Sequence, residues 1–257
     1  MNQEQILIRS DSSFGLTTLT LNRPLAFNSL SEELIKSIQF ELDELMTNES
    51  VRVLVIAGNG RAFCAGHDLR EMIKKPSEKY YEKLFTQCSE MMLSIQKLPV
   101  PVIAKVQGLA TAAGCQLVAQ CDLAIASSEA RFAVSGINLG LFCSTPSVAL
   151  SRNLSRKAAF EMLATGEFIS AEQARIQGLI NRVSPADQLD EATNQFVDQI
   201  IKKPRTSLAL GKKLFYSQLE NNIEQAYSEA AKTMACNMMD SAALKGVQEF
   251  LDKSNTR

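Results

Sequence analysis

Three short stretches of the sequence are almost entirely apolar, broken only by Arg52 in the first and Lys105 in the second. They are Val51–Ala57, Val102–Val106 and Leu123–Ala126. An apolar run of this length is typical of a strand that helices cover on both faces. Helical periodicity fills much of the chain between the first two runs, at about residues 68–74 and 79–98, so strand, helix and strand follow one another as in a right-handed crossover. The sequence therefore predicts an α/β fold built in layers.

Two serine-containing segments predict where helices begin. Ser29 and Glu32 stand at capping-box spacing before a helix with a 3.6-residue apolar period, and Ser170 and Gln173 repeat the pattern. In a capping box, each side chain accepts a hydrogen bond from the backbone N–H of the other residue. We therefore expect helices to start at both places.

The last part of the chain has a different pattern. Beyond about residue 186 the periodicity is helical to the end, and no Pro- or Ser-rich linker separates this part from the rest. We expect a core of residues 1–190 and a helical C-terminal region of residues 191–257. Such a region packs either on its own core or on a neighbouring subunit.

The composition excludes several classes of protein. With 46% hydrophobic and 21% charged residues, the 257-residue chain is not disordered, collagen-like or a coiled coil. A net charge of −1 argues against nucleic acid or an anionic membrane as the main partner. No apolar run approaches the length of about 18 residues that a membrane span needs. Met1–Gln5 shows no export or organelle signal, and the six cysteines form no CxxC pair, so we expect a cytoplasmic protein with reduced thiols.

Two segments place small residues where a loop meets the start of a helix. They are Phe63–Met72 and Gly108–Leu117. Backbone N–H groups at a helix start are unpaired and lie at the positive end of the helix dipole. Two such junctions side by side can direct two donors at one oxygen, as in an oxyanion hole, although small residues also simply allow close packing. The first segment holds the single histidine, His67, so a histidine pair or a His-rich metal site is excluded.

These segments closely resemble the crotonase superfamily, also called the enoyl-CoA hydratase/isomerases. The motifs are AFCAGHDLREM (62–72), VQGLATAAGCQL (106–117) and CDLA (121–124). Residues 140–146 further resemble the subgroup known as enoyl-CoA hydratase domain-containing protein three. The resemblance implies a crotonase-like (ββα) spiral fold with a helical C-terminal extension and a homotrimer or dimer of trimers. It also implies an acyl-CoA thioester as substrate or ligand, with no other cofactor and no metal.

The resemblance assigns roles to individual residues. His67 and Ala113 match the residues whose backbone N–H groups hold the thioester oxygen and stabilise an enolate. The matched positions that line the coenzyme A channel are Leu25, Ala26, Phe27, His67, Asp68, Leu69 and Arg70. Phe250 and Lys253 match residues that contact the nucleotide end of coenzyme A, and the helical tail of this family usually completes a neighbour's site.

Two positions depart from the family pattern. Hydratases of this family use two glutamates to activate a water and to protonate the α-carbon, and the matching residues here are Gln116 and Gly136. Neither exchanges a proton near neutral pH. Ser144 stands where isomerases and dehalogenases carry a carboxylate, and Asp68 and Glu71 are placed to cap the helix that follows the first loop. We therefore expect hydration of enoyl-CoA to be weak or absent.

Three functions stay open at this point. The overall resemblance indicates a hydratase/isomerase-type enzyme, a lyase or isomerase of fatty acyl metabolism. A protein that kept the pocket and lost the chemistry would be a non-catalytic acyl-CoA binder or regulatory protein. The run Ala65–Asp68 also resembles methylmalonyl-CoA decarboxylase, which lacks the glutamates but has a tyrosine where this chain has Cys143. Decarboxylation needs an oxyanion hole and no base.

Overall fold

The predicted buried strands lie side by side in a mainly parallel sheet. The computed structural model describes residues 5–74 and 76–255, and within them this sheet has six strands in the order β1-β2-β3-β5-β7-β10. All neighbours are parallel except β1 and β2, which form an antiparallel hairpin. The strands are β1 (Leu7–Asp11), β2 (Leu16–Leu21), β3 (Val53–Gly58), β5 (Val102–Val106), β7 (Leu123–Ser127) and β10 (Arg182–Ser184).

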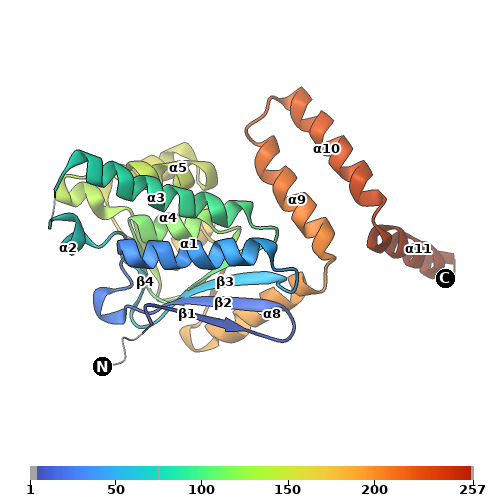
Figure 1. Cartoon of the computed structure of the whole chain (residues 1–257), viewed down its shortest axis with the longest axis horizontal. Coiled ribbons are helices and arrows are strands. Elements are labelled where there is room, and N and C mark those ends of the chain that lie inside the picture. Colours follow the sequence, from blue (N-terminus) through green and yellow to red (C-terminus); the bar gives the residue numbers. More distant parts are fainter. Residues whose placement is uncertain (1–4, 75, 256–257) are drawn as a thin grey trace.

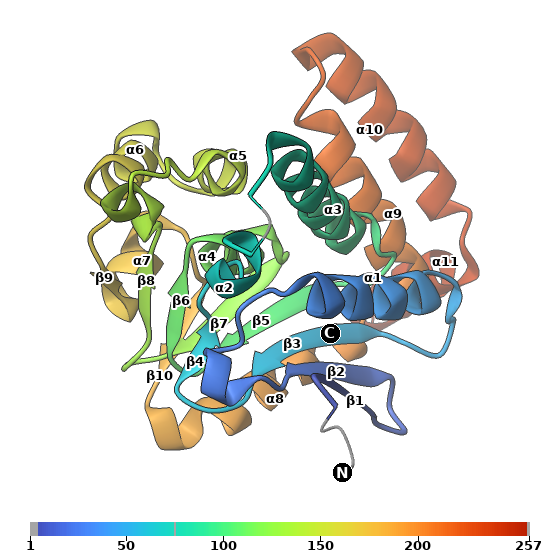
Figure 2. The same cartoon turned by 60° about the vertical axis from the view of Figure 1, so that its left-hand side comes forward.

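Strand β3 shows why such a run is apolar. Val53 and Val55 pack on one face of the sheet with the apolar side of α8, whereas Leu54 and Ile56 belong to the larger core on the other face. Figure 2 shows α1 and α3 on one side of this sheet and α8 on the opposite side. These helices are α1 (Glu32–Thr47), α3 (Glu78–Lys97) and α8 (Leu189–Ile201). The predicted α/β layers are therefore confirmed.

A second, smaller sheet carries the segments predicted to be functional. Within the described part of the chain it has four strands in the order β4-β6-β8-β9, and β4, β6 and β8 run parallel (Figure 2). They are β4 (Ala62–Cys64), β6 (Leu109–Thr111), β8 (Arg131–Ala133) and β9 (Ile169–Ser170). No strand here exceeds three residues, which is too short for a period to be recognised. The sequence therefore does not predict this sheet.

The rest of the chain is mostly helical. Four helices pack around the smaller sheet: α4 (Ala113–Gln120), α5 (Ser144–Asn153), α6 (Arg156–Thr165) and α7 (Ala171–Gln177). Three more form an arm that extends away from both sheets in Figure 1: α9 (Arg205–Gln218), α10 (Ile223–Met238) and α11 (Ser241–Asn255). In residues 5–74 and 76–255, no helix combines the length and the hydrophobicity needed to cross a bilayer.

A buried ion pair fixes the arm to the core. Lys212 of α9 donates to Asp122 at 2.6 Å and also to two main-chain carbonyls, while the hydroxyl of Tyr216 donates to the second carboxylate oxygen at 2.8 Å.

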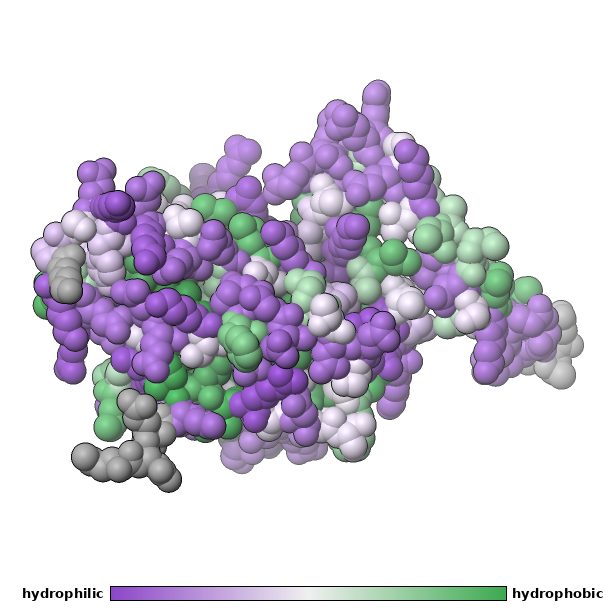
Figure 3. Space-filling view, viewed as in Figure 1, coloured by the Kyte–Doolittle hydropathy of each residue, from purple (hydrophilic) through white to green (hydrophobic). Residues whose placement is uncertain are grey.

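Beyond α9, apolar patches interrupt the hydrophilic surface of the arm (Figure 3). The exposed apolar side chains of this part include Leu244 and Phe250. Helix α8 crosses the predicted boundary at residue 190, and the division into two regions stays a prediction.

The two predicted capping boxes have different outcomes. Ser170 and Gln173 each accept a hydrogen bond from the backbone of the other, so the box before α7 is confirmed. Helix α1 is instead capped by Ser31, whose Oγ accepts from the third helical N–H at 3.2 Å. The prediction for Ser29 is wrong because its carbonyl accepts from Arg23, and the helix begins only after this contact.

Candidate active site

Three neighbouring strands of the smaller sheet end at one edge. Because β4, β6 and β8 are parallel, their carboxyl ends lie together, which is where ligands bind in open α/β sheets. Residues 65–67, 112–113 and 135–136 follow these three ends. The topology of the smaller sheet therefore brings together segments that are far apart in the sequence.

Two glycines allow the first two loops to touch. Gly66 has a φ of +91°, and a Cβ on it would lie 3.3 Å from the backbone nitrogen of Ala113. A Cβ on Gly114 would lie 2.0 Å from the carbonyl oxygen of Cys64. The small residues therefore permit close packing of the two loops, in which Gly66, the residue before His67, lies against the backbone of Ala113.

The N–H groups of His67 and Ala113 have no acceptor within the described residues. The backbone of Leu30 donates a hydrogen bond to the carbonyl of Gly66 and accepts one from the N–H of Asp68. This β-bridge therefore does not use the N–H of His67. Ala113 is the first residue of α4, where N–H groups have no acceptor in the helix and lie at the positive end of its dipole. Ala112 before it has a φ of 51° and a ψ of −122°, a strained backbone of the kind found at functional sites.

Both loops open onto one apolar cavity of about 280 Å³. Side chains from α2 (Leu69–Met72), from α3 and from the segment before α5 complete its wall. Its described lining residues include no Asp, Glu, Lys or Arg. They are Ala65, His67, Leu69, Met72, Phe85, Ala112, Ala113, Ser135, Gly136, Leu139, Leu141, Phe142, Cys143, Ser144, Thr145 and Pro146.

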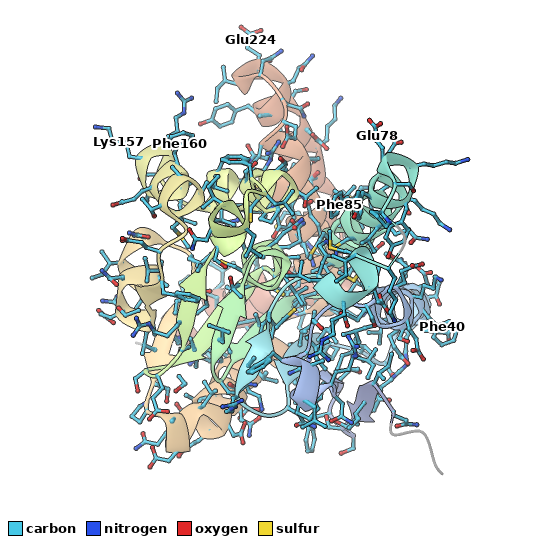
Figure 4. All side chains as sticks on the ribbon, turned by 90° about the vertical axis from the view of Figure 1, so that its left-hand side faces the viewer. Phe40, Glu78, Phe85, Lys157, Phe160 and Glu224 are labelled. Carbon is cyan, nitrogen blue, oxygen red and sulfur yellow. The ribbon has the colours of Figure 1, made fainter. Side chains whose placement is uncertain are left out.

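The imidazole of His67 packs against the edge of Phe85, with 5.3 Å between the ring centroids. Phe85 lies on the inner side of α3, whereas Glu78 of the same helix points outward (Figure 4). Both ring nitrogens of His67 are buried and lack a hydrogen-bond partner in the described structure. Burial lowers the pKa of His67 from 6.5 to about 4, so the ring is neutral at pH 7, with one nitrogen able to donate and the other able to accept.

The two positions that the resemblance matches to glutamates differ in the space around them. Gln116 is buried one turn beyond Ala113, outside the cavity wall as described, and its Oε1 has no partner there. At Gly136, a Cβ would lie 2.6 Å from the carbonyl oxygen of Leu141 and 2.8 Å from Sγ of Cys143. The space that a larger side chain would need at position 136 is therefore occupied.

The acidic side chains beside the first loop have structural partners. Asp68 caps α2 by accepting from the N–H of Arg70 at 3.1 Å, as predicted, and it pairs with Arg23 at 2.8 Å. Burial raises the pKa of Asp68, but the hydrogen bonds and the charge of Arg23 outweigh it, so the net shift is downward. Glu71 accepts from the N–H of Glu32 at 3.0 Å and thereby caps α1 rather than α2. Neither carboxylate is part of the cavity wall described above.

The residues predicted to line the coenzyme A channel lie around the first loop. Leu25–Phe27 include the turn η1 (Pro24–Ala26), and the carbonyl of Phe27 accepts from the N–H of Ala65 at 3.0 Å. The side chain of Leu25 is fully exposed. Leu69 lines the cavity, and Asp68 and Arg70 flank it in the chain.

Phe250 and Lys253 lie elsewhere in the molecule. Both belong to α11, at the end of the arm that points away from the cavity of the same chain (Figure 1). The structure therefore does not bring them to the cavity lined by His67 and Ala113.

Sequence reasoning missed part of the cavity wall. Phe85 comes from the middle of α3, and Leu139–Phe142 come from the segment that follows β8. The sequence signals for the second group are the subgroup resemblance of residues 140–146, which assigns them no role in the cavity, and three large apolar residues around Gly140, whose side chains are exposed in the structure.

Two solved structures match the chain over nearly its whole length. An enoyl-CoA hydratase from Mycobacterium smegmatis is 59% identical, with a TM-score of 0.96 and 97% of each chain covered. Human enoyl-CoA hydratase domain-containing protein 3 is 40% identical, with a TM-score of 0.93 over 97% of this chain and 98% of that chain. These similarities confirm the crotonase-like fold.

A rat protein, enoyl-CoA hydratase domain-containing protein 3, mitochondrial, is 42% identical over 93% of this chain and 80% of its own length. Its similarity confirms the resemblance to that subgroup.

The same name, including the word mitochondrial, belongs to relatives from mouse, Xenopus laevis and human. Our expectation of a cytoplasmic protein is contradicted by these relatives and is withdrawn. It rested on Met1–Gln5, of which residues 1–4 lie outside the described residues.

A family model described as enoyl-CoA hydratase/isomerase matches residues 11–257. The match includes all three loops at the end of the smaller sheet and the whole described arm. The chain therefore belongs to the enoyl-CoA hydratase/isomerase family of the crotonase superfamily.

Proposed function

We propose that the cavity binds an acyl-CoA thioester, with the thioester oxygen between the N–H groups of His67 and Ala113. The observation that carries this proposal is the pair of N–H donors, on touching loops, that have no acceptor within the described protein. Donors fixed in this way stabilise the negative charge of an enolate oxygen, and one such donor contributes a factor of about 100 to 1,000 in rate. The acyl group then lies in the apolar cavity.

The chemistry differs from that of a standard hydratase. Water addition needs a group that takes a proton from water and one that protonates the α-carbon. The described cavity wall holds no carboxylate. The lowered pKa of His67, about 4, makes its ring a weak base toward water and leaves it without a proton to give to the α-carbon at pH 7. We therefore infer an acyl-CoA-binding, enolate-stabilising site in which hydration is weak or absent.

Coenzyme A would extend from the cavity along the turn that holds Leu25–Phe27 and past Arg70. Phe250 and Lys253 would reach the nucleotide end only from a neighbouring copy, because the arm points away from its own cavity. This arrangement supports a homotrimer or a dimer of trimers, whose formation sedimentation velocity would test.

A panel of thioesters tests the function. Butanoyl-CoA, crotonyl-CoA and methylmalonyl-CoA are each scored for thermal stabilisation of the protein and for turnover. Stabilisation by butanoyl-CoA with little crotonyl-CoA hydration is the expected result. Rapid hydration would overturn the inference about the missing acid and base. Release of carbon dioxide from methylmalonyl-CoA would identify a decarboxylase, and stabilisation without any turnover would identify a binder.

A matched pair of variants tests the donors. Ala113→Pro removes one N–H at a helix position that tolerates proline, whereas Ala112→Gly keeps both N–H groups and relieves the positive φ. Loss of one hydrogen bond should weaken butanoyl-CoA binding about 2- to 10-fold in the first variant only. Equal affinities in the two variants would show that the Ala113 N–H does not hold the thioester.

A further inference from the structure

We propose that Cys143 is a covalent attachment site for α,β-unsaturated acyl-CoA thioesters, through addition of its thiol to the β-carbon of the bound acyl group. The inference rests on the proposed function, since it places the thioester oxygen at His67 and Ala113. It concerns a group in the cavity that takes no part in enolate stabilisation.

The first argument is the position of the thiol. Cys143 lines the cavity at the start of α5, and its Sγ lies where a Cβ at position 136 would be only 2.8 Å away. By resemblance, position 136 is one from which hydratases direct a carboxylate at the reacting carbons. Glycine at this position leaves room for the thiol, so Sγ takes the place beside the reacting carbons.

The second argument is that polar groups of this cavity lack protein partners. The buried nitrogens of the His67 ring have none within the described residues, and neither do the N–H groups of His67 and Ala113. Buried polar groups are almost always hydrogen-bonded in folded proteins. Several polar groups without partners around one cavity indicate a polar, carbonyl-containing ligand. The acyl chain of such a ligand would lie along the wall that includes Cys143.

The third argument is chemical selectivity. Among the nucleophilic side chains of the described wall, Ser135 is hydrogen-bonded to Thr111 at 2.9 Å, and Ser144 and Thr145 offer only hydroxyl groups. Cysteine is the most nucleophilic of these groups, because a thiol reaches the reactive thiolate far more readily than a hydroxyl group loses its proton. Burial raises the pKa of Cys143, opposed by a hydrogen bond from the Gly136 backbone, so the resting group is the thiol.

The reaction is a simple addition. The Sγ–Cβ bond forms, the C=C π electrons move toward the thioester, and the resulting enolate oxygen is held by the two N–H groups. The S–H bond breaks as the Sγ–Cβ bond forms. Because a thiol gives up its proton far more readily than water does, the weakly basic, neutral ring of His67 in the same cavity can take this proton, which ends on the α-carbon. The product is a saturated thioether that retains coenzyme A, and no other reactant is required.

The chain contains its own control thiol. Cys236 of α10 is exposed, and it lies outside the cavity wall, whereas Cys64, Cys88, Cys115 and Cys121 are buried and also outside it. Reaction in free solution would therefore modify Cys236 first. Reaction of a bound thioester would modify Cys143 first.

The test is mass spectrometry of the protein after incubation with crotonyl-CoA, with peptide mapping and with butanoyl-CoA as the saturated control. We expect one adduct of the full crotonyl-CoA mass at Cys143, formed about tenfold or more faster than at Cys236 because the bound reactants are held together. Excess butanoyl-CoA should slow formation of this adduct. Cys143→Ala should abolish the adduct and Cys236→Ser should not, and circular dichroism verifies that both variants fold. Peptide mapping of the wild-type protein identifies the modified cysteine without any variant.

The outcomes separate the two proposals. Thermal stabilisation by butanoyl-CoA without an adduct at Cys143, or with Cys236 modified as fast, would overturn this inference and leave the proposed function intact. Absence of any stabilisation by butanoyl-CoA would overturn the proposed function and, with it, this inference.

Discussion

Lowering the pH from about 7 to about 5 should remove about 2 kcal/mol from the free energy of unfolding through His67 alone. In the unfolded chain this histidine binds a proton with a pKa near 6.5, whereas burial lowers the pKa of the folded ring to about 4. Between these values the unfolded state holds one more proton, so stability falls as the pH falls. The loss begins near pH 6.5 and levels off near pH 4, where it totals about 3 kcal/mol.

Few other groups contribute in this window. The sequence has no second histidine. The pKa values of Asp11 and Asp68 are lowered in the folded state, so the stability that they provide is present above their ordinary pKa of 3.8 and is lost only as the pH falls through and below that value. Burial lowers the pKa of Lys212, which affects stability only in the alkaline range. The change between pH 7 and pH 5 is therefore attributable to one ring.

The assay is urea unfolding at fixed protein concentration, followed by far-ultraviolet circular dichroism because the chain has no tryptophan. His67→Gln is the control, since its side chain does not titrate and its pH dependence in this range should be nearly flat. The Hε1 proton of the single histidine gives one resonance whose midpoint reports the folded pKa directly. A midpoint near 6.5, or equal pH dependence in the variant, would refute the reasoning.

Three further substitutions test the described contacts. Gly136→Glu should cost about 1–3 kcal/mol because its Cβ would meet Sγ of Cys143 at 2.8 Å, and it should not restore hydration; a thermal midpoint equal to that of the wild type would contradict the reported packing. Lys212→Met should cost about 3–5 kcal/mol in urea unfolding, because Asp122 would keep a buried charge without its partner; a loss under 1 kcal/mol would show that the pair is solvated. Ser170→Ala should cost about 1 kcal/mol by the same measurement, and no loss would argue against the capping box.

The larger sheet was predictable because its strands carry enough residues for a pattern. In β3, four successive buried residues alternate between two cores, and this need for apolar groups on both faces is visible in the sequence. Strands β4, β6 and β8 have three residues each, so their pairing is decided by tertiary contacts. The start of α1 was misplaced for a related reason, since the contact of Arg23 with the Ser29 carbonyl is invisible to local spacing.

The candidate site was predictable where it depends on backbone. Small residues before helix starts, together with the family resemblance, indicate His67 and Ala113, and the parallel pairing of β4 with β6 explains why both line one cavity. The cavity wall was not predictable in the same way. Phe85 reaches it from a helix whose apolar period predicts burial but not the partner, and Leu139–Phe142 depend on the path of a segment without regular periodicity.

The two positions that the resemblance matches to glutamates, Gln116 and Gly136, are not equivalent in the structure. Gln116 keeps nearly the size of glutamate, and its buried Oε1 lies without a partner in the described structure, so the change there is one of chemistry and not of shape. At Gly136 the space that a larger side chain would need is filled by the Leu141 carbonyl and the Cys143 thiol. Exchanging Gln116 for glutamate would change the chemistry of the side chain more than its size, whereas a larger side chain at position 136 would require the Leu141 carbonyl and the Cys143 thiol to shift. Placing a carboxylate at position 136 is therefore the harder change. Under the proposed function, the groups left for chemistry in this part of the cavity are a thiol and two N–H groups.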